Sequence, residues 1–218
     1  AVTIPEGFTM QQIAGLLEEK GVADSGAFLS LASDQEFAYS LGIQGPSLEG
    51  FLFPDTYRLS KGMGEKRIAQ MLVGRFQAVF KDEYRKKLQD LSITLEELVT
   101  LASIIEKETA DPVERHLISA VLHNRLKAGM MLQSDPTVIY GMSDFSGNLT
   151  REDLQKANPY NTYLMKGLPP HPIANSGEAS LKAALFPAPV PYRYFVSKNN
   201  GTHHFSTTLA EHERAVKT

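Results

Sequence analysis

The stretch TLEELVTLASIIEKETADP, residues 94–112, determines how the chain is organised. Thr94 followed by Glu97 is a capping box, which predicts a helix that begins at residue 95. The Asp111-Pro112 pair predicts that this helix stops near Ala110 and that a second helix follows it, with Asp111 as N-cap. Apolar residues recur between these signals at helical spacing and predict one buried face: Leu95, Leu98, Val99, Ala102 and Ile105.

The sequence before this helix also predicts mostly helical structure. Residues 2–4 predict a short strand, and Thr9 with Gln12 forms a capping box for a helix that Gly21 closes. Further helices are expected after Ser25 and after Ser33, which is followed by Glu36. Residues 64 to about 89 carry apolar residues among Lys and Arg, and this pattern predicts one long amphipathic helix.

The residues after it predict a helix, two loops, another helix and a hairpin. In the helix that starts at Pro112, Glu114 completes a capping box and Gly129 ends the helix. Its expected buried residues are Val113, Leu117, Val121 and Leu126. Residues 129–142 and 158–177 are loop-rich, and a helix of about nine residues is expected after Gly177.

The last part of the chain predicts a β-hairpin and a final helix. In YRYFVSKNNGTHHFST, residues 192–207, two alternating runs flank Asn200-Gly201, a strong signal for a type I′ turn. Thr208 with Glu211 caps the final helix. The predicted fold class is α+β, mostly helical, with a small antiparallel β element and a C-terminal hairpin.

Composition excludes several classes of protein. With 218 residues, 42% of them hydrophobic and 22% charged, the chain is typical of a soluble globular protein. A net charge of -3 gives no electrostatic reason to expect nucleic acid as a partner. The chain lacks cysteine, so disulfides and thiolate nucleophiles are excluded. It begins Ala-Val, and we expect that a signal or anchor was removed before residue 1.

Familiar catalytic motifs are absent from the sequence. There is no H-E-x-x-H, no G-x-S-x-G, no P-loop and no dinucleotide fingerprint. The six histidines lack ligand spacing, so we expect neither a metal nor a cofactor.

Glu106 and Glu108 are the candidate acids that remain. On a helical wheel Glu106 falls near the buried edge, which favours it as the more buried residue, although such a Glu often only pairs with a Lys or Arg. Glu108 lies in the last turn, where the helix dipole disfavours a carboxylate. With partial desolvation, this position would raise the pKa of Glu108 and keep a proton donor ready for a glycosidic oxygen. Both glutamates could equally be a charged helix end.

The loops over residues 129–142 and 158–177 contain residue types that are typical of carbohydrate-binding grooves. Tyr140, Tyr160 and Tyr163 offer flat apolar faces, and Asn161 offers an amide donor and acceptor. The alternative is ordinary turn chemistry, in which Asn-Pro and Pro-Pro make loops and tyrosines pack over them.

Several long motifs resemble one family, the endolytic murein transglycosylases, also called YceG-like proteins. In order along the chain these are EGFLFPDTY (49–57), ASIIEKET (102–109), MLQSDPTVIYG (131–141), YNTY (160–163), GLPPHPIANSG (167–177) and YFVSKNNGTHHFSTTLAEH (194–212). Residues 1–48 resemble the family's preceding segment only loosely. We therefore expect an N-terminal helical segment at 1–48 and a catalytic domain at 49–218, or one continuous domain over 1–218.

The resemblance implies lytic cleavage of the glycan strands of bacterial peptidoglycan, without water, to give 1,6-anhydro ends. It implies that Glu108 is the single acid and base. The expected substrate-binding residues are Glu49, Gln133, Asp135, Tyr140, Tyr160, Asn161 and Tyr163. It further implies attachment to the outer face of the cytoplasmic membrane by a preceding helix, so that this chain is a soluble fragment, and the cell-wall synthesis machinery as a partner.

Two other functions stay open on the sequence. A muramidase would hydrolyse the same bond with a second carboxylate, for which Asp135 is the best candidate. A non-catalytic scaffold module would bind wall glycan through Tyr160 and Asn161 and release no product.

Overall fold

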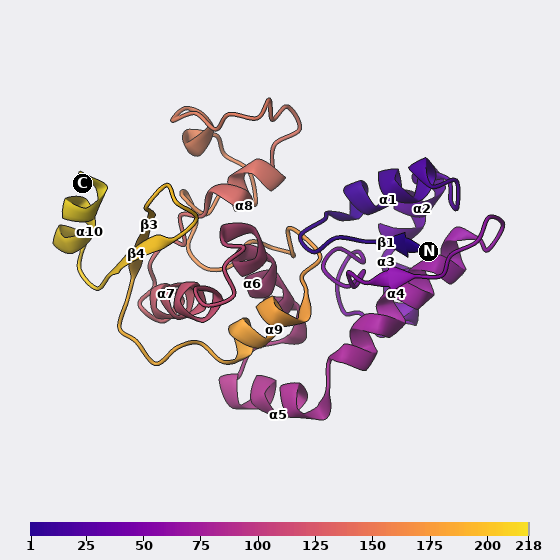
Figure 1. The fold of residues 1–218 in the computed structure, drawn as a ribbon, viewed down its shortest axis with the longest axis horizontal. Helices are drawn as coiled ribbons and strands as arrows, with labels where there is room; N and C mark the ends of the chain where they lie inside the picture. Colours follow the sequence, from indigo (N-terminus) through magenta and orange to yellow (C-terminus); the bar gives the residue numbers. More distant parts are fainter. Residues whose placement is uncertain (218) are drawn as a thin grey trace.

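The computed structural model describes residues 1–217 and confirms the α+β class. Over these residues the chain forms ten α-helices, one short 3₁₀ helix and two antiparallel two-stranded sheets. The N-terminal elements gather on one side of the molecule, helix α6 lies in the middle, and the C-terminal hairpin lies on the other side (Figure 1). One buried apolar cluster draws residues from both 1–48 and 49–218. The division of the chain into domains stays a prediction.

The N-terminal side consists of short helices around a small sheet. Its elements are β1 (Val2–Thr3), α1 (Met10–Glu19), α2 (Ser25–Ala32), α3 (Gln35–Ser40), β2 (Thr56–Tyr57) and α4 (Glu65–Val79). The capping box of Thr9 and Gln12 is present, as predicted. The prediction of Ser33 as the cap of the third helix is wrong, because Asp34 accepts the Phe37 N–H at 2.6 Å and is the N-cap.

The predicted long helix over 64–89 is in fact two helices. Helix α4 ends at Val79, and α5 (Asp82–Leu91) begins after an extended Lys81. The break lets α5 reach the start of α9 (Glu178–Leu185), where the Tyr84 hydroxyl donates to Glu178 at 2.9 Å. A periodic pattern does not reveal such a break, because both halves keep an apolar face.

Helix α6 (Leu95–Glu108) is the centre of the fold. It begins with the predicted capping box of Thr94 and Glu97, and every residue from Leu98 to Ile105 is buried. It packs against α9, α7 (Arg115–Lys127) and α8 (Asp135–Tyr140), which surround it in Figure 1. The loop predicted over 129–142 therefore contains a helix, α8.

The helix after α6 begins three residues later than predicted. Pro112 begins a turn that directly follows Asp111, and Val113, expected in the core, is 77% exposed. Glu114 completes no capping box, because its carboxylate binds a histidine near the other end of the chain. Of the buried residues expected here, Val121 is buried, whereas Leu117 and Leu126 are only partly covered.

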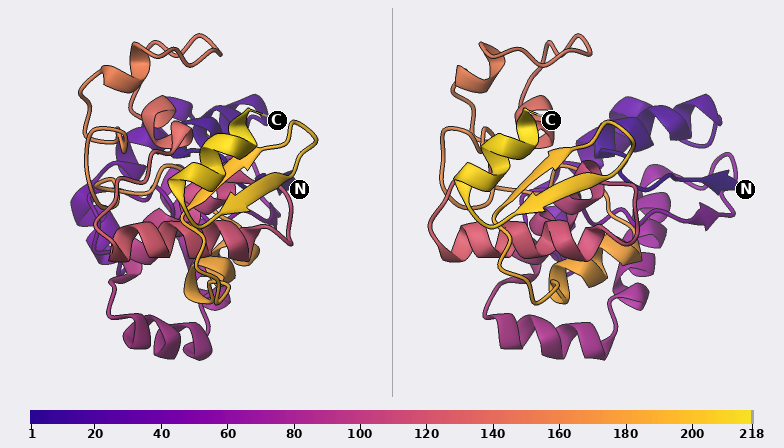
Figure 2. Two further views of the ribbon diagram at one scale, coloured as in Figure 1. Left: turned by 90° about the vertical axis from the view of Figure 1, so that its left-hand side faces the viewer. Right: turned by 60° about the vertical axis from the view of Figure 1, so that its left-hand side comes forward.

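The C-terminal hairpin is present, with a wider loop than predicted. Strands β3 (Tyr194–Ser197) and β4 (His203–Ser206) pair antiparallel, so five residues separate the paired Ser197 and His203. The two-residue turn prediction is therefore wrong, and within the wider loop the Asn200 side chain accepts hydrogen bonds from the backbone N–H and the hydroxyl of Thr202. Helix α10 (Leu209–Val216) covers one face of the hairpin (Figure 2), with His212 stacked on Tyr194 at 5.3 Å.

Among the helices of residues 1–217, none is both long and apolar enough to cross a bilayer.

Gly50 occupies the tightest junction of the fold. Its φ is +89°, and an added Cβ would lie 2.6 Å from Pro172 and 2.7 Å from Val99 of α6. Residues 49–57, α6 and the 167–177 loop therefore meet at a point where only glycine fits.

Gly50→Ala should lower the free energy of unfolding by roughly 2–4 kcal/mol, because overpacking adds to the strain of a positive φ. Urea denaturation measures this change. The matched control is Gly62→Ala, since Gly62 also has a positive φ of +82° but no atom within 4 Å of an added Cβ. The control should lose only about 1 kcal/mol, from the backbone alone. Equal losses in both variants would show that the junction is not tight.

Candidate active site

The two glutamates at the end of α6 have different surroundings. The Glu106 side chain is 6% exposed, accepts the Gly177 N–H at 3.1 Å and lies 3.6 Å from the guanidinium of Arg115. Glu108 keeps part of its surface exposed, although protein atoms surround its carboxyl group. Glu106 pairs with an arginine, as such residues often do. Both glutamates are intermediate in overall exposure, so the helical-wheel prediction that Glu106 is the more buried residue stays a prediction.

The carboxyl group of Glu108 is held in a protonatable state. Burial raises its pKa from the usual 4.5 to about 7, and the negative charge of Asp135 adds to this increase. A hydrogen bond from the Ser134 hydroxyl, 2.5 Å from Oε1, acts in the opposite direction. Positive charge on His203 and Arg125 also lowers the pKa. A carboxyl group with a pKa near neutral can both give and take a proton.

Ser134 and Asp135 come from the segment that leads into α8. Ser134 is buried, whereas Asp135 is exposed and accepts the Tyr163 hydroxyl at 2.6 Å. Gln133 is also exposed, adopts a left-handed backbone with a φ of +52°, and lies 3.4 Å from Arg125. The structure therefore brings three predicted binding residues, Gln133, Asp135 and Tyr163, to the neighbourhood of Glu108.

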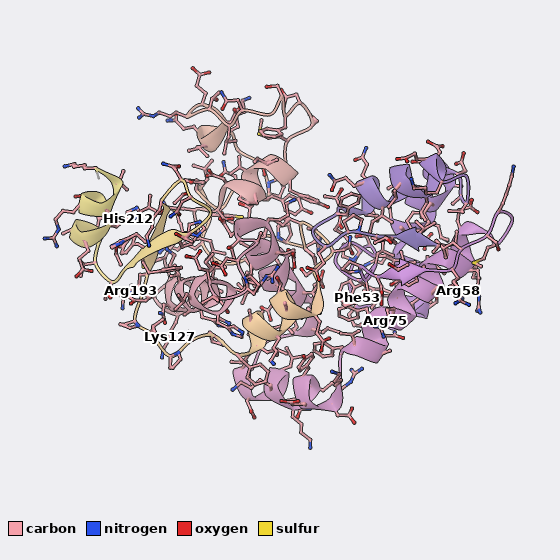
Figure 3. The ribbon with its side chains drawn as sticks, in the orientation of Figure 1. Phe53, Arg58, Arg75, Lys127, Arg193 and His212 are labelled. Carbon is pink, nitrogen blue, oxygen red and sulfur yellow. The ribbon has the colours of Figure 1, made fainter. Side chains whose placement is uncertain are left out.

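Arg125 holds this segment against the hairpin. It is 8% exposed, and its guanidinium donates to the carbonyl groups of Leu132 at 2.8 Å and Arg193 at 2.6 Å. Arg193 lies just before β3 (labelled in Figure 3). The Tyr194 ring lies 5.2 Å from the same guanidinium. Arg125 thus connects α7 to the segment before Ser134 and to the start of the hairpin.

Glu49 and Asn161 are buried, contrary to the expectation of sugar contact. Glu49 is 4% exposed and accepts hydrogen bonds from the Met10 N–H, the Tyr140 hydroxyl and the Asn175 amide. Burial raises its pKa to about 7.

Asn161 is fully buried. Its amide donates to the carbonyl groups of Leu154 and Lys156, and its side-chain oxygen accepts the Tyr163 N–H. Glu49 and Asn161 therefore hold loops in place, because their polar atoms are already used inside the protein.

Tyr140 and Tyr160 form a half-buried pair. Their rings meet edge to face with centroids 4.9 Å apart, next to the buried Glu49. Because both rings keep some exposed surface, a sugar contact by either tyrosine stays a prediction.

Sequence reasoning missed four residues around Glu108: Ser134, Arg125, His203 and Glu114. Ser134 was within reach of a local signal, since a serine before Asp-Pro is a typical helix start. Glu114 and His203 are 89 residues apart and meet only in the fold. Across residues 1–217, no three His, Asp or Glu side chains converge as they would around a metal ion.

The chain is similar in sequence to the proteins of one known family. A sequence model of the YceG-like family matches residues 1–218. An endolytic murein transglycosylase of Bacillus subtilis is 33% identical, over 98% of this chain and 63% of the relative. One from Streptococcus pneumoniae strain D39 is 29% identical, over 99% of this chain and 44% of the relative. The chain thus spans less than two thirds of the length of these curated relatives.

A solved structure has the same fold. The crystal structure of a YceG-like protein from Listeria monocytogenes is similar with a TM-score of 0.88 and 35% sequence identity. The match covers 98% of this chain and 75% of that one.

Glu108→Gln should stabilise the protein at pH 8 and have little effect near pH 4.5. The folded state binds a proton at Glu108 more tightly than the unfolded state, so wild-type stability falls as pH rises from about 4.5 to about 7. Glutamine removes this pH-dependent loss, which corresponds to roughly 3 kcal/mol at most. Urea denaturation of both proteins across this pH range measures the difference in free energy of unfolding. The raised pKa of Glu49 affects both proteins equally and cancels in this difference.

Glu106→Gln is the matched control, because Glu106 lies two residues before Glu108 on the same helix. It weakens a buried ion pair with Arg115 and should lower the free energy of unfolding at pH 8 by about 1–3 kcal/mol. A difference between Glu108→Gln and wild type that stayed constant with pH would contradict the elevated pKa of Glu108.

Proposed function

Because this chain belongs to the YceG-like family, we propose that it is a lytic transglycosylase that cuts peptidoglycan glycan strands internally. The observation that carries the proposal is Glu108, a carboxyl group whose pKa is about 7, partly exposed beside Gln133, Asp135 and Tyr163. The substrate lies outside the cytoplasmic membrane, so the proposal includes extracytoplasmic action. Attachment to the outer face of that membrane and contact with the cell-wall synthesis machinery belong to the proposal as well.

In the proposed reaction Glu108 acts first as an acid. Its proton passes to the glycosidic oxygen that joins C1 of N-acetylmuramic acid to N-acetylglucosamine, and the C1–O bond breaks. The departing sugar keeps that proton as a hydroxyl group. Burial favours this step, because it keeps Glu108 protonated near neutral pH and stabilises the neutral acid relative to the carboxylate.

Glu108 then acts as a base. Its carboxylate takes the proton of the 6-hydroxyl of the same muramic residue while O6 bonds to C1, which gives the 1,6-anhydro end. The enzyme ends with its proton restored, and no water is consumed. The Ser134 hydroxyl supports this half of the cycle, since its hydrogen bond at 2.5 Å favours the carboxylate.

Gln133, Asp135 and Tyr163 are the proposed sugar-binding residues nearest to the acid. Asp135 and Tyr163 share a 2.6 Å hydrogen bond, which orients the exposed carboxylate at the start of α8. Tyr140 and Tyr160 extend the proposed groove toward the N-terminal side of the molecule.

Hydrolysis by a muramidase is the second candidate function, and Asp135 is the observation that favours it. Its charge acts on Glu108, so two carboxyl groups are present as a hydrolase requires. The two activities differ in product, because an anhydro end lacks the water that a reducing end contains.

Glu108→Gln should lower the rate of release of anhydro products by roughly 10²–10⁴-fold, since glutamine cannot exchange the proton. The assay is digestion of purified wall sacculi followed by mass analysis, with rates expressed per folded molecule. Glu106→Gln should retain most of the activity of its folded fraction, because it lies outside the reacting group.

Asp135→Asn separates the two candidate functions. If the reaction is lytic and uses one acid, the Asp135→Asn variant should release anhydro ends more slowly than wild type and should release no reducing ends. Reducing ends from the wild-type protein would overturn the lytic proposal, and wild-type protein that releases no fragments would indicate a binding module.

A further inference from the structure

Ser134 is the N-cap of α8, but its side chain does not cap the helix. A serine at this position usually accepts a hydrogen bond from a backbone N–H of the first turn, and no such bond is present here. The Ser134 hydroxyl instead donates to Oε1 of Glu108 at 2.5 Å. Among residues 1–217, Ser134 is the one hydrogen-bond partner of that carboxyl group. The orientation of the Ser134 hydroxyl therefore matters directly to the acid.

Two buried threonines bind both backbone groups of Ser134. The Ser134 N–H donates to Oγ1 of Thr162 at 3.0 Å, and the Ser134 carbonyl oxygen accepts from Oγ1 of Thr137 at 2.6 Å. The two threonine hydroxyl oxygens lie 2.8 Å apart. Both threonines are fully buried, and Ser134 is 2% exposed. Three hydrogen bonds thus form a closed ring, which we call the threonine ring, around the backbone of Ser134.

The chemistry of the groups fixes the direction of every hydrogen bond in the threonine ring. A backbone N–H only donates, and a carbonyl oxygen only accepts. Thr137 has one hydroxyl hydrogen, which goes to the Ser134 carbonyl, so Thr137 must accept from Thr162. Each hydroxyl therefore both accepts and donates, an arrangement in which hydrogen bonds strengthen one another. Loss of the hydroxyl at either position opens the ring.

Thr162 also holds the residue before Ser134. Gln133 has a φ of +52°, in the left-handed region that residues other than glycine rarely adopt. Its N–H donates to the Thr162 carbonyl oxygen at 3.1 Å. Met131 and Lys166 form an antiparallel bridge, so the segments 131–134 and 162–166 run side by side. Thr162 thus accepts from two successive N–H groups and sets the path of the chain into Ser134.

We propose that Thr162 and Thr137 are positioning residues for the lytic reaction, because the threonine ring fixes the backbone of Ser134 so that the Ser134 hydroxyl is directed at Glu108. The inference rests on the proposed function. A donor that is already fixed needs no reorganisation when the acid becomes a carboxylate between the two proton transfers. Since Thr162 directly precedes Tyr163, the ring also ties the acid to the loop that carries a proposed sugar-binding residue.

The test uses the whole 218-residue chain with four variants and one control. Thr162→Val, Thr137→Val and the double variant keep the branched shape but lose the hydroxyl, whereas Thr162→Ser keeps it. The matched control is Thr100→Val, since Thr100 is 1% exposed on α6 and lies outside the threonine ring. Two quantities are measured for each protein: the pH profile of anhydro-product release per folded molecule, and the titration of the Glu108 carboxyl carbon by NMR, assigned from its loss in Glu108→Gln.

Thr162→Val should raise the pKa of Glu108, because it weakens the Ser134 hydrogen bond that lowers this pKa. The alkaline limb of the rate profile should move to higher pH. Product release at neutral pH should slow by about 10- to 100-fold, the size of loss that a small misplacement of a reacting group causes. Thr137→Val should change both quantities in the same direction. The double variant should not exceed the larger single effect, because either substitution opens the same ring.

Thr162→Ser and Thr100→Val should match wild type in both quantities. Rescue by serine separates loss of the hydroxyl from loss of packing, since serine restores the hydrogen bonds and not the methyl group. A change in the pKa of Glu108 then reports its hydrogen bond with Ser134. The other side chains that act electrostatically on Glu108 are the same in every variant: Asp135, Arg125 and His203.

An unchanged Glu108 titration in folded Thr162→Val or Thr137→Val overturns the inference. Should neither valine variant fold, hydrogen exchange in the wild-type protein decides, because a Ser134 amide hydrogen that exchanges as fast as an exposed one means that the ring is open. Slow exchange supports the ring. Wild-type protein that releases no anhydro ends would sink the proposed function instead, and the NMR titration would still show whether the threonine ring acts on Glu108.

Discussion

Helix α6 is buried on every side from Leu98 to Ile105, and this burial determines where its last residues must lie. A helix packed on all faces cannot rotate or slide without opening cavities in the core. The residues that follow the buried run, Glu106 to Glu108, therefore emerge at one set position. One glutamate is turned toward the scaffold around Arg115 and Gly177, and the other toward the segment that carries Ser134.

Burial has different consequences for the glutamates of this region. Both carboxylate oxygens of Glu106 and of Glu114 have partners. Those of Glu106 lie near the Arg115 guanidinium and the Gly177 N–H, and those of Glu114 accept from the ring and the backbone N–H of His203. Glu49 is surrounded by neutral donors, and its pKa rises to about 7 because hydrogen bonds offset only part of the desolvation. Glu108 has the same elevated pKa, yet it alone of these four combines it with partial exposure. Its chemistry follows from that combination and not from its residue type.

Opposing effects set the pKa of the Glu108 carboxyl group. Desolvation and Asp135 favour the protonated acid, while Ser134, His203 and Arg125 favour the carboxylate. A pKa near neutral is useful to a group that must act first as an acid and then as a base, because neither form is strongly preferred. Asp135 begins α8 and Ser134 directly precedes it, whereas Arg125 lies on α7 and His203 on β4. The proton balance at Glu108 thus depends on how these elements pack.

The features of this protein that depend on local chemistry can be predicted from its sequence. The capping boxes at Thr9, Thr94 and Thr208 start helices where predicted, because a cap needs only residues three positions apart. The tertiary structure decided the break between α4 and α5, the late start of α7 and the burial of Glu49 and Asn161. It also decided the Glu114–His203 contact across 89 residues. Each of these depends on which distant group satisfies a buried polar atom, and no periodicity or spacing along the chain records that partner.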